Sequence, residues 1–121
     1  MMMRDAFHEE LDQISNSLLN MASLVNLAME DATQALLKPD LGIAEKVIAA
    51  DDVIDQMQHD LDARTISLMA RQQPVASDLR TLVTGLRMSA DLERMGDMAH
   101  HIAKSARMRY PNSAIPEELK P

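Results

Sequence analysis

Apolar residues recur along the first part of the chain in alternating steps of four and three residues. This spacing returns to one side of an α-helix at every step and is typical of a long helix packed in a bundle. We call such a line of apolar positions a seam, and the first seam comprises Phe7, Leu11, Ile14, Leu18, Met21, Val25, Ala28, Ala32 and Ala35. Pro39 then cannot continue the helix, while Asp40 can cap the next one by accepting a hydrogen bond from an exposed amide. The pattern predicts a first helix over residues 4–37.

Two further seams of the same kind follow. The second contains Ile43, Val47, Ala50, Ile54, Met57, Leu61 and Leu68. It ends near Pro74, which suits the first turn of a third helix because its missing amide hydrogen costs nothing there. The third seam contains Leu79, Leu82, Leu86, Met88, Leu92, Met95, Ala99, Ile102 and Ala106. It stops before Tyr110 and Pro111, so two more long helices are expected, with a break between them at residues 73–77.

Three long helices joined by short turns run antiparallel to their neighbours. Composition supports a helical core, because the chain has one Phe, one Tyr, no Trp and 11 Met residues, whereas sheets favour aromatic and β-branched side chains. The expected fold is all-α, an antiparallel three-helix bundle over residues 3–110. Residues 111–121 are rich in helix breakers and lack periodicity, which predicts a linker or tail.

Bulk properties exclude several classes of function. The formal net charge of −7 opposes binding to nucleic acid or anionic lipid, since both attract proteins through Lys and Arg. No apolar run approaches the ~20 residues that a membrane-spanning helix needs, and the N-terminus lacks the order of a secretory signal. Cysteine is absent, and the three glycines are dispersed, which leaves no thiolate chemistry and no phosphate-binding loop. We therefore expect a cytoplasmic protein that is not an enzyme and has no direct membrane insertion.

Two pairs of carboxylates are candidate metal ligands. Asp51 and Asp55 lie four residues apart on the second predicted helix, and Glu93 and Asp97 lie four apart on the third, so each pair shares a helix face. Like charges at this spacing repel, and a cation held between adjacent helices would remove the repulsion, since oxygen ligands suit Mg²⁺, Ca²⁺, Mn²⁺ or iron. The alternative is a solvated acidic face, because Asp and Glu make up 19 of the 121 residues.

Two histidines lie just beyond the second pair. Asp97 and His100 have the spacing of the carboxylate-x-x-His element found in di-iron bundles. The alternative is that His100 and His101 belong to the basic last turns of the helix, where positive charge complements the helix dipole. The third seam also places Glu93 and Asp97 on the side of the helix that faces away from the core, with His100 one turn further along, so the Asp97-x-x-His100 element is expected to point away from the core. We therefore expect the histidines to be at most accessory ligands.

Two stretches of the third predicted helix and its approach are specific in order and spacing. Residues 72–80 read QQPVASDLR and residues 91–97 read DLERMGD. Met3-Arg4 and the stretch 47–55 fit the same pattern. In these features the chain resembles the PhoU family of phosphate-uptake regulators over residues 3 to about 110.

The resemblance implies properties that spacing alone does not indicate. PhoU-like proteins contain two similar three-helix bundles in tandem and act in the cytoplasm. They repress phosphate-starvation signalling by contacting the ATPase of the phosphate ABC transporter and a sensor histidine kinase. Their E/D-x-x-x-D motifs bind multinuclear metal clusters, which implies a metal site here at Asp51, Asp55, Glu93 and Asp97. The implied cofactor is a divalent or ferric ion: iron, manganese, magnesium or zinc.

Two departures from the family pattern shape the functional hypothesis. A single bundle is present, so we expect a homodimer that imitates the two-bundle parent. His101 stands where many relatives carry Asn. The leading hypothesis is a PhoU-like half that regulates phosphate uptake negatively, as a metal-binding adaptor between the transporter and the kinase. The alternatives are a carboxylate-bridged metalloenzyme of the helix-bundle type and an inert helical oligomerisation scaffold.

Overall fold

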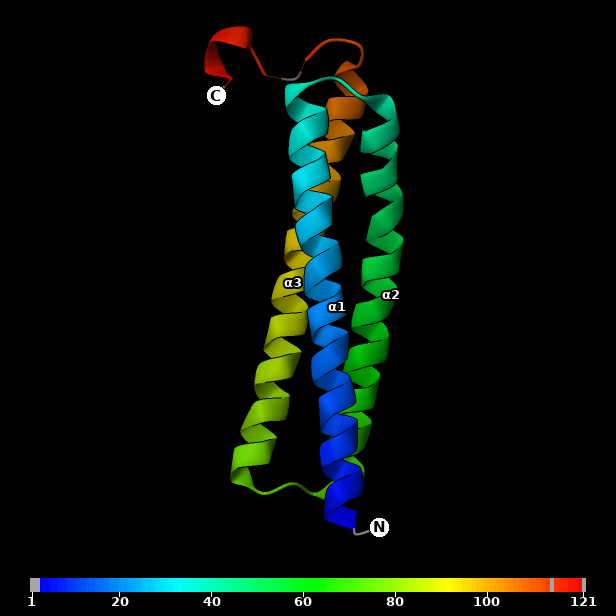
Figure 1. Cartoon of the computed structure of the whole chain (residues 1–121), viewed down its shortest axis with the longest axis vertical. Coiled ribbons are helices and arrows are strands. Elements are labelled where there is room, and N and C mark those ends of the chain that lie inside the picture. Colours follow the sequence, from blue (N-terminus) through cyan, green and yellow to red (C-terminus); the bar gives the residue numbers. More distant parts are fainter. Residues whose placement is uncertain (1–2, 114, 121) are drawn as a thin grey trace.

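The computed structural model describes residues 3–113 and 115–120, with the side chains of residues 3–5 excepted. Three long helices, α1 (Met3–Leu37), α2 (Leu41–Gln72) and α3 (Ala76–Arg109), precede a short 3-10 helix, η1 (Glu117–Leu119). Consecutive long helices run antiparallel, and each of the three packs against both others (Figure 1). The described residues form no strand. The predicted all-α, antiparallel three-helix bundle is confirmed.

The helix ends follow from local chemistry at two loops. Asp40 caps α2 as predicted, because its Oδ1 accepts a hydrogen bond from the backbone N–H of Ile43 at 3.0 Å. Gln73 adopts a left-handed conformation with φ 43° and donates its N–H to the carbonyl oxygen of Met69, which closes α2. Pro74 therefore lies in the connection and not in the first turn of α3, where the sequence placed it, since α3 begins at Ala76.

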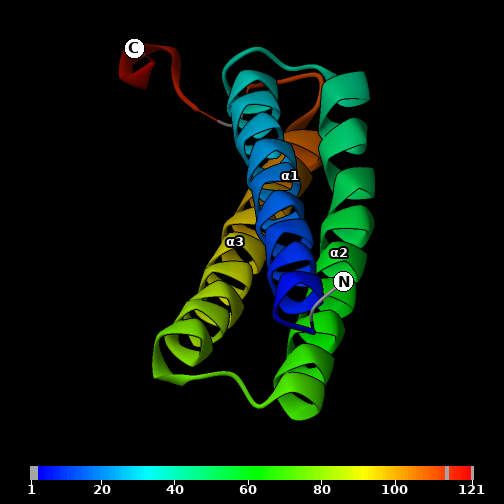
Figure 2. The same cartoon turned by 60° about the horizontal axis from the view of Figure 1, so that its bottom comes forward.

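The core changes in character along the bundle. Where α1 ends and α2 begins, most of the buried residues are alanines: the core there comprises Met21, Val25, Ala28, Ala32, Ala35, Ala44, Val47, Ile54, Ala99, Ala103 and Ala106. Toward the start of α1 the buried residues are larger, namely Phe7, Ile14, Leu61, Leu68 and Leu82. Small side chains let helices approach closely, whereas large ones hold them apart. Accordingly, α3 lies close to α1 in the alanine-rich half and diverges from it toward its own start (Figure 2).

The buried side of α3 agrees with the predicted seam in part, since Leu82, Ala99 and Ala106 are buried as predicted. Met88 and Met95 were expected in the core, but they are 49% and 46% exposed. The buried positions are instead occupied mostly by small residues: Leu82, Gly85, Ser89, Gly96, Ala99, Ala103 and Ala106. A Cβ added at Gly96 would lie 3.3 Å from Cγ2 of Ile54, so the absence of a side chain permits the close approach of α3 to α2. The prediction failed because large apolar residues were given priority over small ones.

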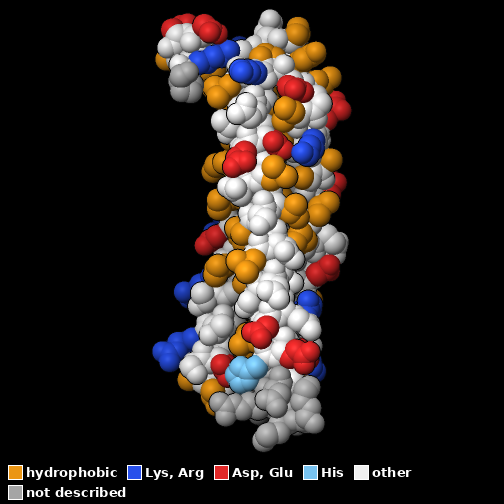
Figure 3. Space-filling model, viewed as in Figure 1, with side chains coloured by type: hydrophobic (Ala, Val, Ile, Leu, Met, Phe, Trp, Pro, Cys, Tyr) orange, Lys and Arg blue, Asp and Glu red, His pale blue; other side chains and the backbone are white. Residues whose placement is uncertain are grey.

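Two surface features complete the fold. Within the described part of the chain, no helix is both long and apolar enough to cross a membrane. Hydrophobic side chains are nevertheless exposed along much of the face seen in Figure 3, interspersed with acidic ones. The exposed large hydrophobic residues of the protein include Leu19 on α1 and Ile66 on α2, which are 66% and 58% exposed.

Candidate metal centre

A buried carboxylate of α2 contacts a histidine of α3. Asp51 occupies a core position in α2, between the buried residues Val47 and Ile54, and is 9% exposed. Its Oδ2 lies 2.7 Å from Nδ1 of His100, and the two side chains are 11% and 18% exposed. His100 therefore lies on the side of α3 that faces the bundle, one turn beyond Gly96. The structure overturns the prediction that the Asp97-x-x-His100 element points away from the core.

The Asp51–His100 pair leaves two polar atoms without partners. Oδ1 of Asp51 and Nε2 of His100 are buried and form no hydrogen bond. Buried polar groups are normally paired, because leaving one unpaired costs about 1–3 kcal/mol. Asp97 lies beside the pair, and one ligand atom from each of Asp51, Asp97 and His100 lies within 4.8 Å of the other two. This donor set, two carboxylates and an imidazole, fits a metal ion.

The remaining two predicted carboxylates lie beside this group. Burial raises the pKa of Glu93 above its ordinary value, and the negative charges of Asp55 and Asp97 raise it further. A side-chain hydrogen bond with Asp55 and the charge of Asp51 act in the same direction. Among the described residues, no Lys or Arg forms an ion pair with any of these four carboxylates. The site is therefore a region of uncompensated negative charge.

The structure brings all four sequence-predicted residues together. Because α2 and α3 are antiparallel, Asp55 lies opposite Glu93, and Asp51 lies opposite Asp97. Asp51 is buried, whereas the side chain of Asp97 is 51% exposed, so the cluster extends from the core to the surface.

The two neighbouring histidines have different surroundings. His101 is 68% exposed and its Nε2 lies 3.3 Å from Oδ2 of Asp97, within the same helix. This outward position agrees with the expectation of a surface residue near the helix end. His100 is the residue that sequence reasoning undervalued. The sequence signal for His100 is the series of small residues around it. Gly96, Ala99 and Ala103 are buried in α3, so position 100 lies next to the side of α3 that packs against the bundle.

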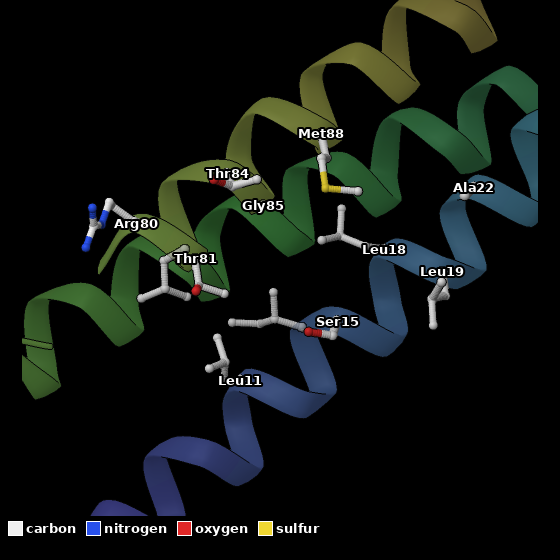
Figure 4. A pocket seen from close by; sticks show the side chains of 12 residues that line it. Leu11, Ser15, Leu18, Leu19, Ala22, Arg80, Thr81, Thr84, Gly85 and Met88 are labelled. Carbon is white, nitrogen blue, oxygen red and sulfur yellow. The ribbon is translucent and has the colours of Figure 1, made fainter. Parts of the chain in front are cut away.

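An apolar groove lies between α1 and the first half of α3, where the two helices diverge. It has a volume of about 510 Å³ and is lined by Leu11, Leu18 and Leu19 from α1 and by Gly85 and Met88 from α3, among others. Figure 4 shows the side chains of Leu18 and Met88 pointing toward one another across it. The groove is a second surface feature, separate from the cluster of carboxylates.

Comparison with known proteins identifies the family to which this chain is similar. The family model of the PhoU domain matches residues 18–106. The phosphate-specific transport system accessory protein PhoU homolog 2 of Mycobacterium tuberculosis is 46% identical over 117 residues, which are 97% of this chain and 55% of that protein. The chain belongs to the PhoU family. A PhoU homolog of Rhizobium meliloti is 36% identical over 94% of this chain and 48% of its own length.

A solved PhoU structure supports the same assignment. The crystal structure of PhoU from Pseudomonas aeruginosa matches with a TM-score of 0.83 and 36% identity. The match covers 89% of this chain and 54% of that one. The chain thus spans about half the length of the PhoU relatives that it matches, and its fold is that of a PhoU three-helix bundle.

Proposed function

We propose that this chain is a metal-binding regulatory adaptor of phosphate uptake. It acts in the cytoplasm as a negative regulator, linking the ATPase of a phosphate ABC transporter to a sensor histidine kinase, and it is not an enzyme. The relatives named above support the connection to phosphate, since they are called accessory proteins of the phosphate-specific transport system. Helical surfaces mediate the docking, and the metal site organises the face formed by α2 and α3.

The observation that carries the metal-binding part is the unpaired chemistry at Asp51 and His100. A buried carboxylate oxygen and a buried imidazole nitrogen lack partners, beside three further carboxylates that no described Lys or Arg neutralises. An iron, manganese, magnesium or zinc ion would supply the positive charge. Asp51, Asp55, Glu93 and Asp97 would hold it and thereby connect α2 to α3.

Metal titration tests this part directly. Protein stripped with a chelator should unfold at a higher temperature when iron, manganese, magnesium or zinc is added, because an ion that binds the folded state stabilises it by about 2.7 kcal/mol at 100 times its Kd. The double variant Glu93→Gln and Asp97→Asn should lose this response. Its metal-free form should be as stable as the parent or slightly more so, since a like-charge pair at this spacing costs about 0.2–0.5 kcal/mol.

A matched control is available on the same two helices. Asp52 and Asp91 are exposed acidic residues next to the site, and neither of them belongs to the four carboxylates. The double variant Asp52→Asn and Asp91→Asn should keep the full metal response. If the parent gains no stability from any of the four metals, or if Glu93→Gln with Asp97→Asn responds like the parent, the carboxylates form only a solvated acidic face.

Regulation is tested in cells. In a bacterium that lacks its own regulator of this family, expression of the chain should lower phosphate uptake and silence a phosphate-starvation reporter in phosphate-rich medium. Tagged protein should also co-purify the transporter ATPase and the sensor kinase. The variant with all four carboxylates neutralised should accumulate normally and fail in both assays. A folded parent protein that changes neither uptake nor the reporter would exclude the regulatory role.

A homodimer completes the proposal. The relatives contain about as much chain again as this one, and the groove between α1 and α3 exposes apolar side chains such as Leu19 and Met88. Burial of apolar surface is the main driving force for association. A second copy of this chain is the occupant that would cover the groove with a bundle of equivalent size.

A further inference from the structure

We propose that His100 is itself a metal ligand and makes the site prefer a transition ion over Mg²⁺ or Ca²⁺. Because this rests on the metal binding proposed above, the experiment must separate the failure of one from the failure of the other. The evidence comes from the placement of His100 relative to Asp51 and Asp97, and from the contrast with His101.

The backbone brings the imidazole to the carboxylates. Gly96 lies against Ile54 so closely that an added Cβ would be only 3.3 Å from a methyl carbon of Ile54. His100, one turn farther along α3, is thereby placed over Asp51, with Nδ1 and Oδ2 2.7 Å apart. One ligand atom from each of Asp51, Asp97 and His100 lies within 4.8 Å of the other two. Three donors from two helices therefore converge on one small volume.

The hydrogen-bonding capacity of the pair is not satisfied. A neutral imidazole has one nitrogen with a hydrogen and one with a lone pair. If Nδ1 donates its hydrogen to Asp51, the lone pair of the buried Nε2 has no donor. Oδ1 of Asp51 has no donor either. The metal-free pair therefore has lone pairs that are available to a cation.

The nitrogen donor determines which ions fit. Imidazole suits zinc, iron, copper and nickel, whereas Mg²⁺ and Ca²⁺ bind oxygen ligands almost exclusively. The four carboxylates alone would therefore give a site for hard cations. His100 adds the donor that favours a transition ion. His101 lacks this role, because it is 68% exposed and its contact is with Asp97 of its own helix.

The experiment measures Zn²⁺ and Mg²⁺ affinities of chelator-stripped protein by titration calorimetry. In the parent, Zn²⁺ should bind more tightly than Mg²⁺. His100→Gln should weaken Zn²⁺ binding by about tenfold or more and change Mg²⁺ binding less than about threefold, so the preference for Zn²⁺ falls. His101→Gln is the matched control, and it should retain the affinities of the parent.

A second measurement needs no variant. Nitrogen-15 chemical shifts of the histidine side chains in the parent should show one ring nitrogen of His100 changing from free to metal-bound on addition of Zn²⁺, with no such change on addition of Mg²⁺. This readout stands even if His100→Gln fails to fold.

The outcomes separate the two proposals. If the parent binds neither ion, the proposed metal-binding function is wrong and the role of His100 falls with it. If the parent binds Zn²⁺ but the resonances of His100 do not change, or His100→Gln keeps the Zn²⁺ preference, the metal site stands and His100 is not a ligand. Equal losses in His100→Gln and His101→Gln would also overturn the assignment, because they would indicate non-specific histidine binding.

Discussion

At the scale of single residues, the site is defined by charge that the rest of the protein leaves uncompensated. Asp51 occupies a buried position of α2 that an apolar residue would normally fill. Glu93 is surrounded by Asp51, Asp55 and Asp97, and its pKa is raised chiefly by burial and then by these neighbours. Carboxylates in such surroundings destabilise the folded state unless a proton or a cation joins them. This cost points to a ligand for the cluster.

We predict that Glu93→Gln stabilises the metal-free protein near neutral pH. A raised pKa in the folded state means that the folded protein binds this proton more tightly than the unfolded chain does. Stability therefore falls as pH rises through the interval between the ordinary glutamate pKa and the raised value. Glutamine does not ionise, so it adds no negative charge to the cluster as pH rises. Its amide group can also donate a hydrogen bond to Asp55, as the protonated glutamate does.

Urea unfolding of chelator-treated protein from about pH 4 to about pH 8 measures this effect. The variant should exceed the parent at the upper end of the range, and the difference should shrink toward the lower end. Glu45→Gln, at an exposed position of α2, serves as the control and should show no comparable gain. A constant difference at all pH values would show that ionisation of Glu93 is not the cause.

At the scale of elements, periodicity predicted the limits of the helices and much of the core. The seams of α1 and α2 were placed correctly because large side chains and alanines at steps of three and four occupy one side of each helix. The break at Pro39 and the cap at Asp40 were also predicted from local chemistry.

The same method predicted the buried side of α3 only in part: Leu82, Ala99 and Ala106 are buried, but the methionines of the predicted seam are not. The exposed face of α3 carries Met88, Met95 and Met98, and a search for large apolar residues selects such a face as the core. Tight packing instead places the glycine, serine and alanine residues of α3 against the other two helices. The carboxylate pairs were found nonetheless, since two residues four positions apart share a face whatever the rotation of the helix. The contact of His100 with Asp51 was not predicted because it depends on that rotation.

We predict opposite effects for alanine at the two glycines buried in α3. A Cβ at Gly85 would lie 3.5 Å from Cδ1 of Leu18, an ordinary contact with the end of a flexible side chain. Gly85→Ala should therefore gain stability of up to about 1 kcal/mol from helix propensity. A Cβ at Gly96 would lie 3.3 Å from Cγ2 of Ile54, a branched side chain that is fully buried, so overpacking of about 1–3 kcal/mol outweighs the same gain.

The midpoints of urea unfolding for the parent and the two variants measure this difference. Gly96→Ala should also weaken the metal response, since it separates α3 from α2 where Asp51 meets His100. A Gly96→Ala variant that is more stable than the parent would show that α3 does not depend on this close approach.

At the scale of the whole molecule, the change in core composition along the bundle separates the carboxylate cluster from the apolar groove. The alanine-rich half holds α2 and α3 together, and the carboxylates and His100 lie beside it. The other half has a core of large residues, where α3 diverges from α1 and leaves the apolar groove (Figures 2 and 4). The proposed metal site and the proposed dimer interface therefore lie in different halves of the bundle.

We predict that the chain is a dimer at tens of micromolar and that the groove between α1 and α3 is its interface. Leu19 is 66% exposed at the rim of this groove, and a charge placed there would have to be buried without a partner, which is strongly unfavourable. Leu19→Glu should therefore shift the mass measured by sedimentation equilibrium from dimer to monomer.

Ile66→Glu is the control for this prediction. Ile66 is a similarly exposed apolar residue, 58% exposed, on α2 and outside the groove, so the change should leave the dimer intact. A monomeric parent would rule out self-association, and a dimer that Ile66→Glu disrupts while Leu19→Glu does not would place the interface on α2.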